Sequence, residues 1–272
     1  MVDEKDKLSE ALRKAQEERD KNSKKAAPSP PPPPISKYVA DVPKSPEAAR
    51  EGIDARLVAY TDPRSPVADQ YRNLMTHLLS LPEAPTLKTL VITSSSLHEG
   101  KTITAINLAI VLSQNLGRKV LIIDCNLRRP AIDSYLGLSA RGGLSNVLTG
   151  TATTDEVIIE TGIHNLFCIC AGEVEASPTE LLSSPKLKET LDNSKNRFDY
   201  IILDTPAVIP YADPKIISKV CDGVLLVVKA ERTRREVISR TESLLKAVGT
   251  KLLGITLTNI QYHIPEYIHK HL

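Results

Sequence analysis

Gly100, Lys101 and Thr102 close a short polar loop whose residue types suit the binding of phosphate. The loop follows the apolar run from Leu90 to Ile92 and precedes a helical pattern of apolar residues, the order that a phosphate-binding loop requires. Backbone N–H groups and the positive helix terminus would hold the anion, while Lys101 reaches the β- and γ-phosphates and Thr102 binds Mg²⁺. The candidate nucleotide-binding residues are Ser94, Ser95, Ser96, Leu97, His98, Glu99, Gly100, Lys101, Thr102 and Ile103.

Ser95 stands where such a loop usually carries its first glycine, in the pattern G-x-x-x-x-G-K-[ST]. A strict search for that pattern would pass over this loop. For the loop alone, a serine-rich turn with a chance Gly-Lys-Thr is therefore an open alternative, and other segments of the chain have to decide between the two.

Two further apolar runs, Val120 to Asp124 and Tyr200 to Asp204, each end in an aspartate. In nucleoside triphosphatases, a carboxylate at the end of a neighbouring strand holds Mg²⁺ or its water shell, and Asp204 fits that position. Asp124 would assist the metal or accept a proton from a hydroxyl nucleophile, and Arg128 would neutralise phosphate charge. One such aspartate is as readily a helix cap, but two together with the loop predict a Mg²⁺-nucleotide site with Thr102, Asp124 and Asp204 as metal ligands.

Alternating strands and helices would position these residues. A continuous apolar run at residues 119–125 predicts a strand that is buried on both faces. Further strands are predicted at residues 90–92, 166–171, 200–204, 223–229 and 251–259. Amphipathic or capped segments predict helices between them, at about residues 65–81, 102–112, 177–182, 187–191 and 233–248. The pattern predicts an α/β fold with a doubly wound, mostly parallel sheet, helices on both faces, and ligands at the carboxyl ends of the strands.

Two helix starts carry specific signals. Ser65 followed by Pro66 predicts an N-cap and a first turn, and Thr233 with Glu236 predicts a capping box.

Composition limits the function classes. The chain has 272 residues, 41% hydrophobic residues and a formal net charge of +2, which is too balanced to indicate nucleic acid or an anionic membrane surface as a partner. Its four cysteines lie in or beside apolar runs without zinc-ligand spacing, so we expect reduced, mostly buried thiols. No apolar run approaches the roughly 18 residues of a membrane span. We therefore expect a cytoplasmic protein that reaches the inner membrane only through a partner.

The first 50 residues differ in composition from the rest. Residues 1–25 are mostly charged with a narrow apolar stripe, and Pro28 and Pro30 to Pro34 form an extended segment that cannot join a core. We predict a flexible, partly helical N-terminal region over residues 1–50 and a nucleotide-binding domain over residues 51–272.

The motifs in this order resemble those of the bacterial tyrosine kinases of capsule and exopolysaccharide assembly. That family carries S-x-x-P-G-E-G-K-T, then D-x-D-x-R after an apolar strand, then D-[ST]-P-P after another. This chain reads Ser94 to Thr102, Asp124 to Arg128 and Asp204 to Ala207 at the three places. Softer matches, among them Gly143 to Leu148, extend the resemblance over nearly all of residues 55–260.

The resemblance implies an ATP- and Mg²⁺-dependent autokinase that phosphorylates C-terminal tyrosines, here Tyr262 and Tyr267, often in trans within a ring of subunits. It implies a membrane-bound activator related to the polysaccharide co-polymerases. It also implies phosphate binding by Lys101, catalytic or metal roles for Asp124 and Asp204, and a contact of Asn259 with adenine.

Three departures from the family pattern bear on catalysis, and a fourth bears on assembly of the ring. Asn126 replaces the second aspartate of D-x-D, which removes a charge near the metal. Leu97 and His98 replace Pro-Gly, at a place where glycine permits unusual backbone angles, and Ala207 replaces a proline. The family helix motif E-x-x-R-x-x-R keeps only Arg72.

Two other function classes compete with the kinase. A regulatory subunit would bind or slowly hydrolyse ATP and signal to a membrane partner by conformation alone. A partition or division-site ATPase would carry a signature lysine early in the loop, where this chain has Ser96.

Overall fold

The computed structural model describes residues 52–259. The predicted N-terminal region, residues 1–50, and the candidate phosphate acceptors Tyr262 and Tyr267 lie outside the described residues, so the proposed division into domains stays a prediction.

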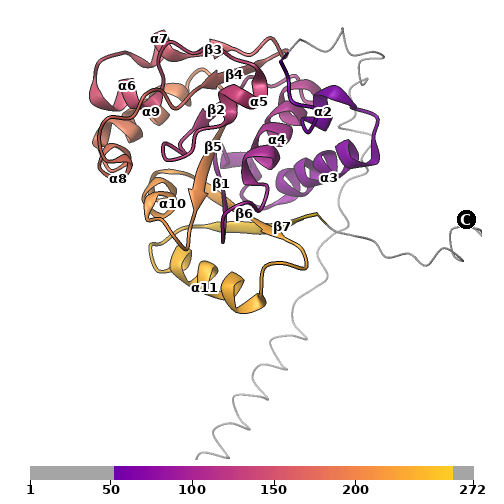
Figure 1. Cartoon of the computed structure of the whole chain (residues 1–272). Helices are drawn as coiled ribbons and strands as arrows, with labels where there is room; N and C mark the ends of the chain where they lie inside the picture. The colour runs from indigo at the N-terminus through magenta and orange to yellow at the C-terminus, as the bar shows by residue number, and fades with distance from the viewer. Residues whose placement is uncertain (1–51, 260–272) are drawn as a thin grey trace, which may run out of the picture. The chain divides into compact units, whose positions relative to one another are not determined.

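A seven-stranded sheet forms the centre of the described chain (Figure 1). Its strand order is β3-β4-β2-β5-β1-β6-β7, and every neighbouring pair is parallel except β3 with β4. The strands are β1 (Thr89–Ser94), β2 (Val120–Asp124), β3 (Ile159–Glu160), β4 (Leu166–Ile169), β5 (Tyr200–Ala207), β6 (Gly223–Lys229) and β7 (Leu252–Thr258). This confirms the mostly parallel sheet that the apolar runs predict.

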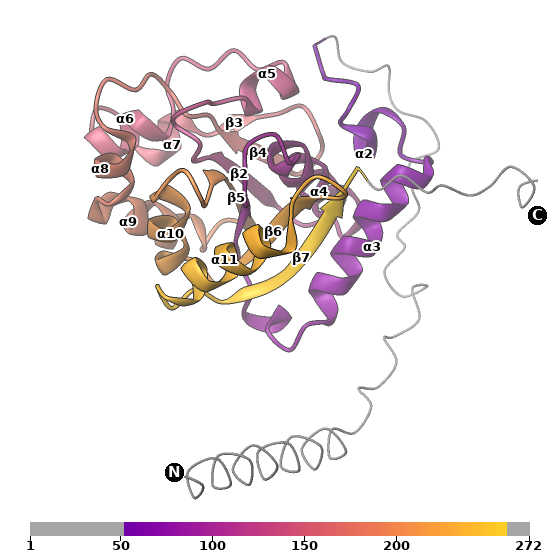
Figure 2. The same cartoon turned by 60° about the horizontal axis from the view of Figure 1, so that its bottom comes forward.

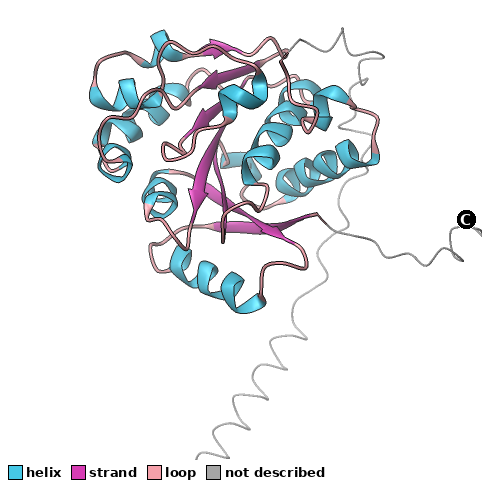
Figure 3. Cartoon of the chain, in the orientation of Figure 1, coloured by secondary structure: helices cyan, strands magenta, loops and turns pink. Residues whose placement is uncertain are grey.

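Helices connect the strands (Figure 3). The α-helices are α2 (Val58–Thr61), α3 (Pro66–Ser80), α4 (Lys101–Asn115), α5 (Ile132–Leu136), α6 (Leu144–Thr149), α7 (Thr154–Val157), α8 (Pro178–Leu182), α9 (Pro185–Ser194), α10 (Asp213–Ile217) and α11 (Arg235–Lys246). Two 3₁₀ helices, η2 (Ala84–Thr86) and η3 (Ser218–Val220), complete the described elements.

Two hydrophobic cores lie on opposite faces of the sheet. Figures 1 and 2 show the helices on the two sides of the sheet. Helices α2 to α5 pack on one face, and α6 and α8 to α11 pack on the other. Alternate strand residues serve the two cores, so that Ile122 faces α4 while Leu121 and Ile123 face the other layer. The helix that follows β1 and the helix that follows β5 therefore cover different faces. In such sheets this reversal opens a ligand crevice at the carboxyl ends of the two strands.

Local sequence signals place α3 correctly but not the start of α11. The Ser65 hydroxyl oxygen accepts a hydrogen bond from the backbone N–H of Ala68, which confirms the predicted cap. The predicted capping box of Thr233 and Glu236 is wrong. Helix α11 begins at Arg235 with Arg234 at the N-cap and no side-chain cap, so Thr233 lies one residue before the cap position. The Thr233 hydroxyl donates a hydrogen bond to Glu99.

Two further features of the described residues are the burial of the thiols and the character of the helices. Cys125, Cys168 and Cys170 are buried free thiols, and Cys221 is a half-buried one. Within residues 52–259, no helix combines the length and the apolar character that crossing a membrane requires.

A buried amide joins the segment before α3 to the nucleotide core. Asn107 on α4 is fully buried; its Oδ1 accepts from the Ala59 N–H at 2.9 Å, and its Nδ2 donates to the carbonyls of Arg56 and Ile103. The segment over residues 52–61 is therefore held on α4 by polar as well as apolar contacts.

We expect Asn107→Ala to lower the free energy of unfolding by about 2–4 kcal/mol, because a buried N–H and two carbonyls lose their partner. Urea unfolding followed by circular dichroism measures this. The exposed Asn193→Ala on α9 is the matched control and should change stability by less than about 0.5 kcal/mol. Equal effects of the two substitutions would contradict the role given to Asn107.

Candidate functional site

The predicted phosphate loop runs from the end of β1 to the start of α4 with two left-handed residues. Gly100 has φ +90°, and a Cβ there would lie 3.4 Å from the Thr258 methyl carbon. His98 has φ +62°, a conformation that costs a residue with a side chain roughly 1 kcal/mol or more. The backbone thus adopts the angle for which the family uses glycine, although this chain carries histidine there.

Thr102 links the loop helix to the neighbouring strand. Its hydroxyl donates to Asp204 Oδ2 at 2.6 Å, and both side chains are buried. The other carboxylate oxygen, Asp204 Oδ1, is buried and has no hydrogen-bond partner among the described residues. An unpaired buried carboxylate oxygen is costly unless a cation or water meets it.

Asp124 ends β2 directly opposite Asp204 in the parallel register of β2 and β5. Its Oδ1 accepts from the N–H of Asn126 at 3.0 Å, and its Oδ2 accepts from the N–H groups of Ala131 and Ile132 at 2.9 and 3.1 Å. Asp124 therefore fixes the loop between β2 and α5, and it is only 1% exposed.

Both carboxylates hold their protons more tightly than usual. Burial and then the charge of Asp204 raise the pKa of Asp124 to about 7, against the backbone hydrogen bonds, which lower it. Burial raises the pKa of Asp204 to about 6, although Lys101 and Thr102 lower it. Two adjacent buried carboxylates thus repel each other, which favours a cation between them.

The side chains present fit Mg²⁺. Among residues 52–259 no group of three or more acidic, histidine or cysteine side chains forms a metal cluster. Mg²⁺ does not need one, since it commonly takes one or two carboxylates, a hydroxyl and phosphate oxygens and keeps several waters. Thr102 and Asp204, with its unpartnered oxygen, match this set.

A pocket of about 330 Å³ opens beside these residues, lined by Lys101, Thr102, Ile103, Asn126, Arg129 and others. Lys101 starts α4 at the pocket floor, and its charge lowers the pKa of Asp204. A cation beside a helix N-terminus is suited to phosphate. Asn126 lines this pocket, and its Nδ2 donates to the Arg129 carbonyl at 2.9 Å.

Arg128 also lines the pocket, but its guanidinium is engaged by protein groups. Nε donates to Asp213 Oδ2 at 2.6 Å, Nη2 donates to Thr179 Oγ1 at 2.7 Å, and the group lies 4.7 Å from the centre of the Tyr211 ring. Asp213 is fully buried. The predicted phosphate-neutralising residue therefore joins the β2–α5 loop to α8 and α10.

A second pocket, of about 450 Å³, adjoins the other side of the loop and is lined by Ser96, Leu97, Glu99, Arg232, Thr233 and Arg234. Leu97 lines both pockets, so the loop separates them. Asn259 follows β7, whose last residue Thr258 contacts the loop, and it is exposed.

Most of the predicted site residues come together around the loop. Some of them line the pocket, and others are bonded to protein groups. Lys101, Thr102 and Ile103 line the pocket, Asp204 lies behind Thr102, and Glu99 bonds within the protein. Ser94 Oγ donates to the Ser96 carbonyl, while Ser95 Oγ is buried without a partner among the described residues. Sequence reasoning missed Thr179, Asp213 and Thr258, since no local motif links these residues to the loop.

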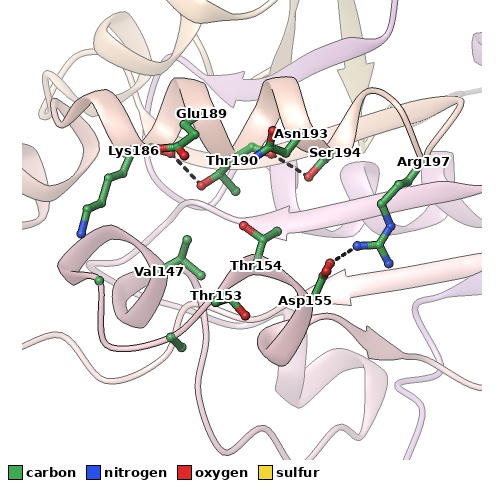
Figure 4. A pocket seen from close by; sticks show the side chains of 12 residues that line it. Val147, Thr153, Thr154, Asp155, Lys186, Glu189, Thr190, Asn193, Ser194 and Arg197 are labelled. Atoms are coloured by element: carbon green, nitrogen blue, oxygen red, sulfur yellow. Dashed lines mark hydrogen bonds and ion pairs between the residues drawn. The ribbon is translucent and has the colours of Figure 1, made fainter.

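A third pocket, of about 440 Å³, lies between α9 and the α6–α7 segment (Figure 4). The hydroxyls of Thr190 and Ser194 donate to carbonyls within α9, and Arg197 pairs with Asp155 at its edge. The residues of the predicted phosphate loop do not line this pocket, so we place the chemistry at the loop.

The raised pKa values predict a pH-dependent stability. Between about pH 4 and 7 these two carboxyls bind more protons in the folded than in the unfolded chain, so their contribution to the free energy of unfolding falls as pH rises. Asp204→Asn removes one group and its repulsion of Asp124. We expect it to flatten the fall and to raise stability at pH 7 by about 1–3 kcal/mol. Urea unfolding from pH 4.5 to 7.5 in a chelator measures this.

Asp192→Asn is the control for that series, because Lys188 holds the pKa of this exposed carboxyl below its usual range. It should leave the fall between pH 4 and 7 unchanged. Parallel curves for the wild-type chain and Asp204→Asn would refute the assignment.

Comparison with known proteins agrees with this geometry. Residues 88–252 match the family model described as an AAA domain. The tyrosine-protein kinase YwqD of Bacillus subtilis (strain 168) is 33% identical over 198 residues, which cover 73% of this chain and 83% of that protein. The crystal structure of the chimerical protein CapA2B2 has a TM-score of 0.72 at 29% identity and covers 76% of this chain and 91% of the other.

A more distant likeness concerns the nucleotide. The septum site-determining protein MinD of Pyrococcus horikoshii OT3, solved as a complex with Mg-ADP, has a TM-score of 0.56 at 25% identity and covers 68% of this chain and 76% of the other. The family match spans the loop and both aspartates. The chain belongs to the bacterial tyrosine-protein kinases, on a nucleotide-binding domain of the AAA type.

Proposed function

We propose that this protein is an ATP-dependent tyrosine autokinase that regulates the synthesis and export of capsular polysaccharide or exopolysaccharide. The observation that carries the proposal is the hydrogen bond from Thr102 to Asp204, which joins the phosphate loop to a carboxylate with a free buried oxygen. In the same protein family, relatives bear the name tyrosine-protein kinase.

We assign the following roles. Lys101 and the backbone of the loop bind the phosphates, and Thr102 and Asp204 hold Mg²⁺, with Asp124 as the second carboxylate. Bound Mg²⁺ supplies positive charge that neutralises the transferring phosphoryl group. The tyrosine oxygen bonds the γ-phosphorus as the bond to ADP breaks, and the phenol proton passes to a carboxylate. We propose Asp124 as that carboxylate.

Arg128 and Asn259 have different proposed roles from each other. Because Arg128 is paired with Asp213, we propose that it shapes the wall of the pocket and does not neutralise phosphate. The exposed Asn259, beside the loop at the end of β7, remains our candidate for the adenine contact.

The proposed partner is the cytoplasmic segment of a membrane-bound co-polymerase that activates the kinase. A CapA2B2 chimera among the structural neighbours supports an activator of the CapA type. We also propose a homo-oligomer, in which one copy presents its tail to the loop of the next, and association with the inner membrane through the activator.

A regulatory subunit without kinase activity is the second candidate. Asp124 favours it, because this carboxylate is 1% exposed and already accepts three backbone hydrogen bonds. Such a subunit would bind ATP and change conformation. It would not phosphorylate tyrosine, because no carboxylate would be available to accept the phenol proton. A partition ATPase fits less well, since Ser96 replaces the signature lysine.

Lys101→Ala should weaken ATP binding at least tenfold, because the cation beside the phosphates is lost. Titration calorimetry with ATP and Mg²⁺ measures the affinity. Lys246→Ala, on the exposed face of α11, is the matched control and should bind ATP like the wild-type chain. Full affinity of Lys101→Ala would remove the loop from the site.

The tail assignment predicts that ³²P-labelled ATP transfers its label to the full chain, and that Tyr262→Phe together with Tyr267→Phe abolishes the transfer. The assay is run with Mg²⁺, alone and with the activator's cytoplasmic segment. Tyr60→Phe, in α2, keeps the label if the acceptors lie in the tail. Label that persists in the double variant would refute these acceptors, and ATP binding without any label would favour the regulatory subunit.

A further inference from the structure

Glu99 lies within the phosphate loop, yet its carboxylate bonds to other parts of the protein. The residue is 2% exposed, and Oε2 accepts from the backbone N–H of Ser96 at 2.7 Å. Oε1 accepts from the hydroxyl of Thr233 in the β6–α11 connection. Its carbonyl oxygen accepts from the hydroxyl of Thr258, the last residue of β7, at 2.8 Å. Glu99 therefore joins three segments that are far apart in the sequence.

We propose that Glu99 is a positioning residue that couples the nucleotide state of the loop to the β6–α11 connection and the first residues of α11, together residues 230–237. The proposal rests on the proposed function, since it assumes that the loop binds a nucleotide. It gives Glu99 no contact with phosphate.

The charge of Glu99 supports a positioning role. A carboxylate in a phosphate loop repels phosphate, so direct contact with the nucleotide would weaken binding. Glu99 is absent from the lining of the pocket that holds Lys101, and it lines the pocket on the other side, with Arg232 and Arg234. Hydrogen bonds to an ionised acceptor are roughly twice as strong as neutral ones, so both bonds restrict the loop strongly.

The start of α11 shows how the connection is held. Helix α11 has Arg234 at its N-cap and no side-chain cap, and Thr233 lies one residue before it. The Thr233 hydroxyl donates to Glu99, so this hydrogen bond runs to the loop and not to the helix. A change in the loop can therefore act on the β6–α11 connection through this bond, which is the coupling that we propose.

The second attachment leads toward the proposed acceptor tail. Thr258 bonds the Glu99 carbonyl, and its side chain also meets Gly100, where a Cβ would lie within 3.4–3.7 Å of three Thr258 atoms. A shift of the loop around phosphate therefore acts on the end of β7 as well as on the β6–α11 connection.

Hydrogen–deuterium exchange of the full chain with and without Mg²⁺-ADP tests the coupling. In the wild-type chain we expect slower exchange both at residues 94–102 and at residues 230–237. Thr233→Val keeps the side-chain shape and removes the donor. It should retain the slowing at residues 94–102, lose it at residues 230–237, and raise the Kd for ADP about threefold or more.

Two substitutions of Glu99 distinguish the length of its side chain from the charge of its carboxylate. Glu99→Gln can still bond both Ser96 and Thr233, so we expect it to keep the response at residues 230–237. Glu99→Asp is one methylene shorter and cannot reach both donors, so it should lose that response. Thr86→Val, the same change as Thr233→Val at an exposed position of η2, is the control and should behave as the wild-type chain.

Each outcome decides the matter. If residues 230–237 respond equally in the wild-type chain, Thr233→Val and Glu99→Asp, the nucleotide contacts them directly and the coupling through Glu99 is wrong. If residues 94–102 respond but residues 230–237 do not in the wild-type chain, the coupling is also wrong while the nucleotide site stands. No response at residues 94–102 would overturn the nucleotide site and the coupling together.

Discussion

The burial of two facing carboxylates is the constraint on which the rest of the site depends. Asp124 and Asp204 are register partners at the ends of β2 and β5, and each is 1% exposed. Buried carboxylates are unfavourable unless donors or cations meet them. The chain supplies three backbone N–H groups to Asp124 and the Thr102 hydroxyl to Asp204. Those donors come from the β2–α5 loop and from α4, so the carboxylates determine where both segments lie.

The phosphate loop is held differently on its two sides. Toward β5, Thr102 donates a hydrogen bond to Asp204, whose other carboxylate oxygen has no partner among the described residues. Lysine and arginine side chains line the neighbouring pocket. Toward β6 and β7, Glu99 has all of its hydrogen bonds with protein groups, and Thr258 closes against Gly100. One side of the loop is therefore available for chemistry, and the other connects the loop to the rest of the sheet. A loop without its usual first glycine is kept in shape by these contacts.

Local patterns predicted the elements well because their causes are local. Continuous apolar runs mark strands that are covered on both faces, and Ser65 with Pro66 marks a helix start through one side chain and one ring. The Thr233 prediction failed for a physical reason of the opposite kind. The helix starts one residue later than the capping pattern predicts, which leaves Thr233 outside the cap position, and the fold places its hydroxyl against Glu99, 134 residues away in the sequence.

Arg128 illustrates the limit for site residues. Its position after Asp124 suggested phosphate, yet its partners Thr179 and Asp213 lie 51 and 85 residues further along the chain. No spacing rule predicts that pairing, because it arises only when α8 and α10 pack beside the β2–α5 loop. Asn126 also bonds to a protein group, since its amide donates to the Arg129 carbonyl. It lines the pocket as a neutral side chain.

By itself, the sequence determined the sheet, the phosphate loop and the two aspartates, since each depends on residue type and on spacing within one strand, loop or helix. The tertiary structure alone decided which of these groups meet. The packing of distant segments forms the hydrogen bonds of Thr102 with Asp204, of Thr233 and Thr258 with Glu99, and of Arg128 with Asp213. The physical reason is that a hydrogen bond needs its two atoms about 3 Å apart, and only the packing of distant segments produces that distance.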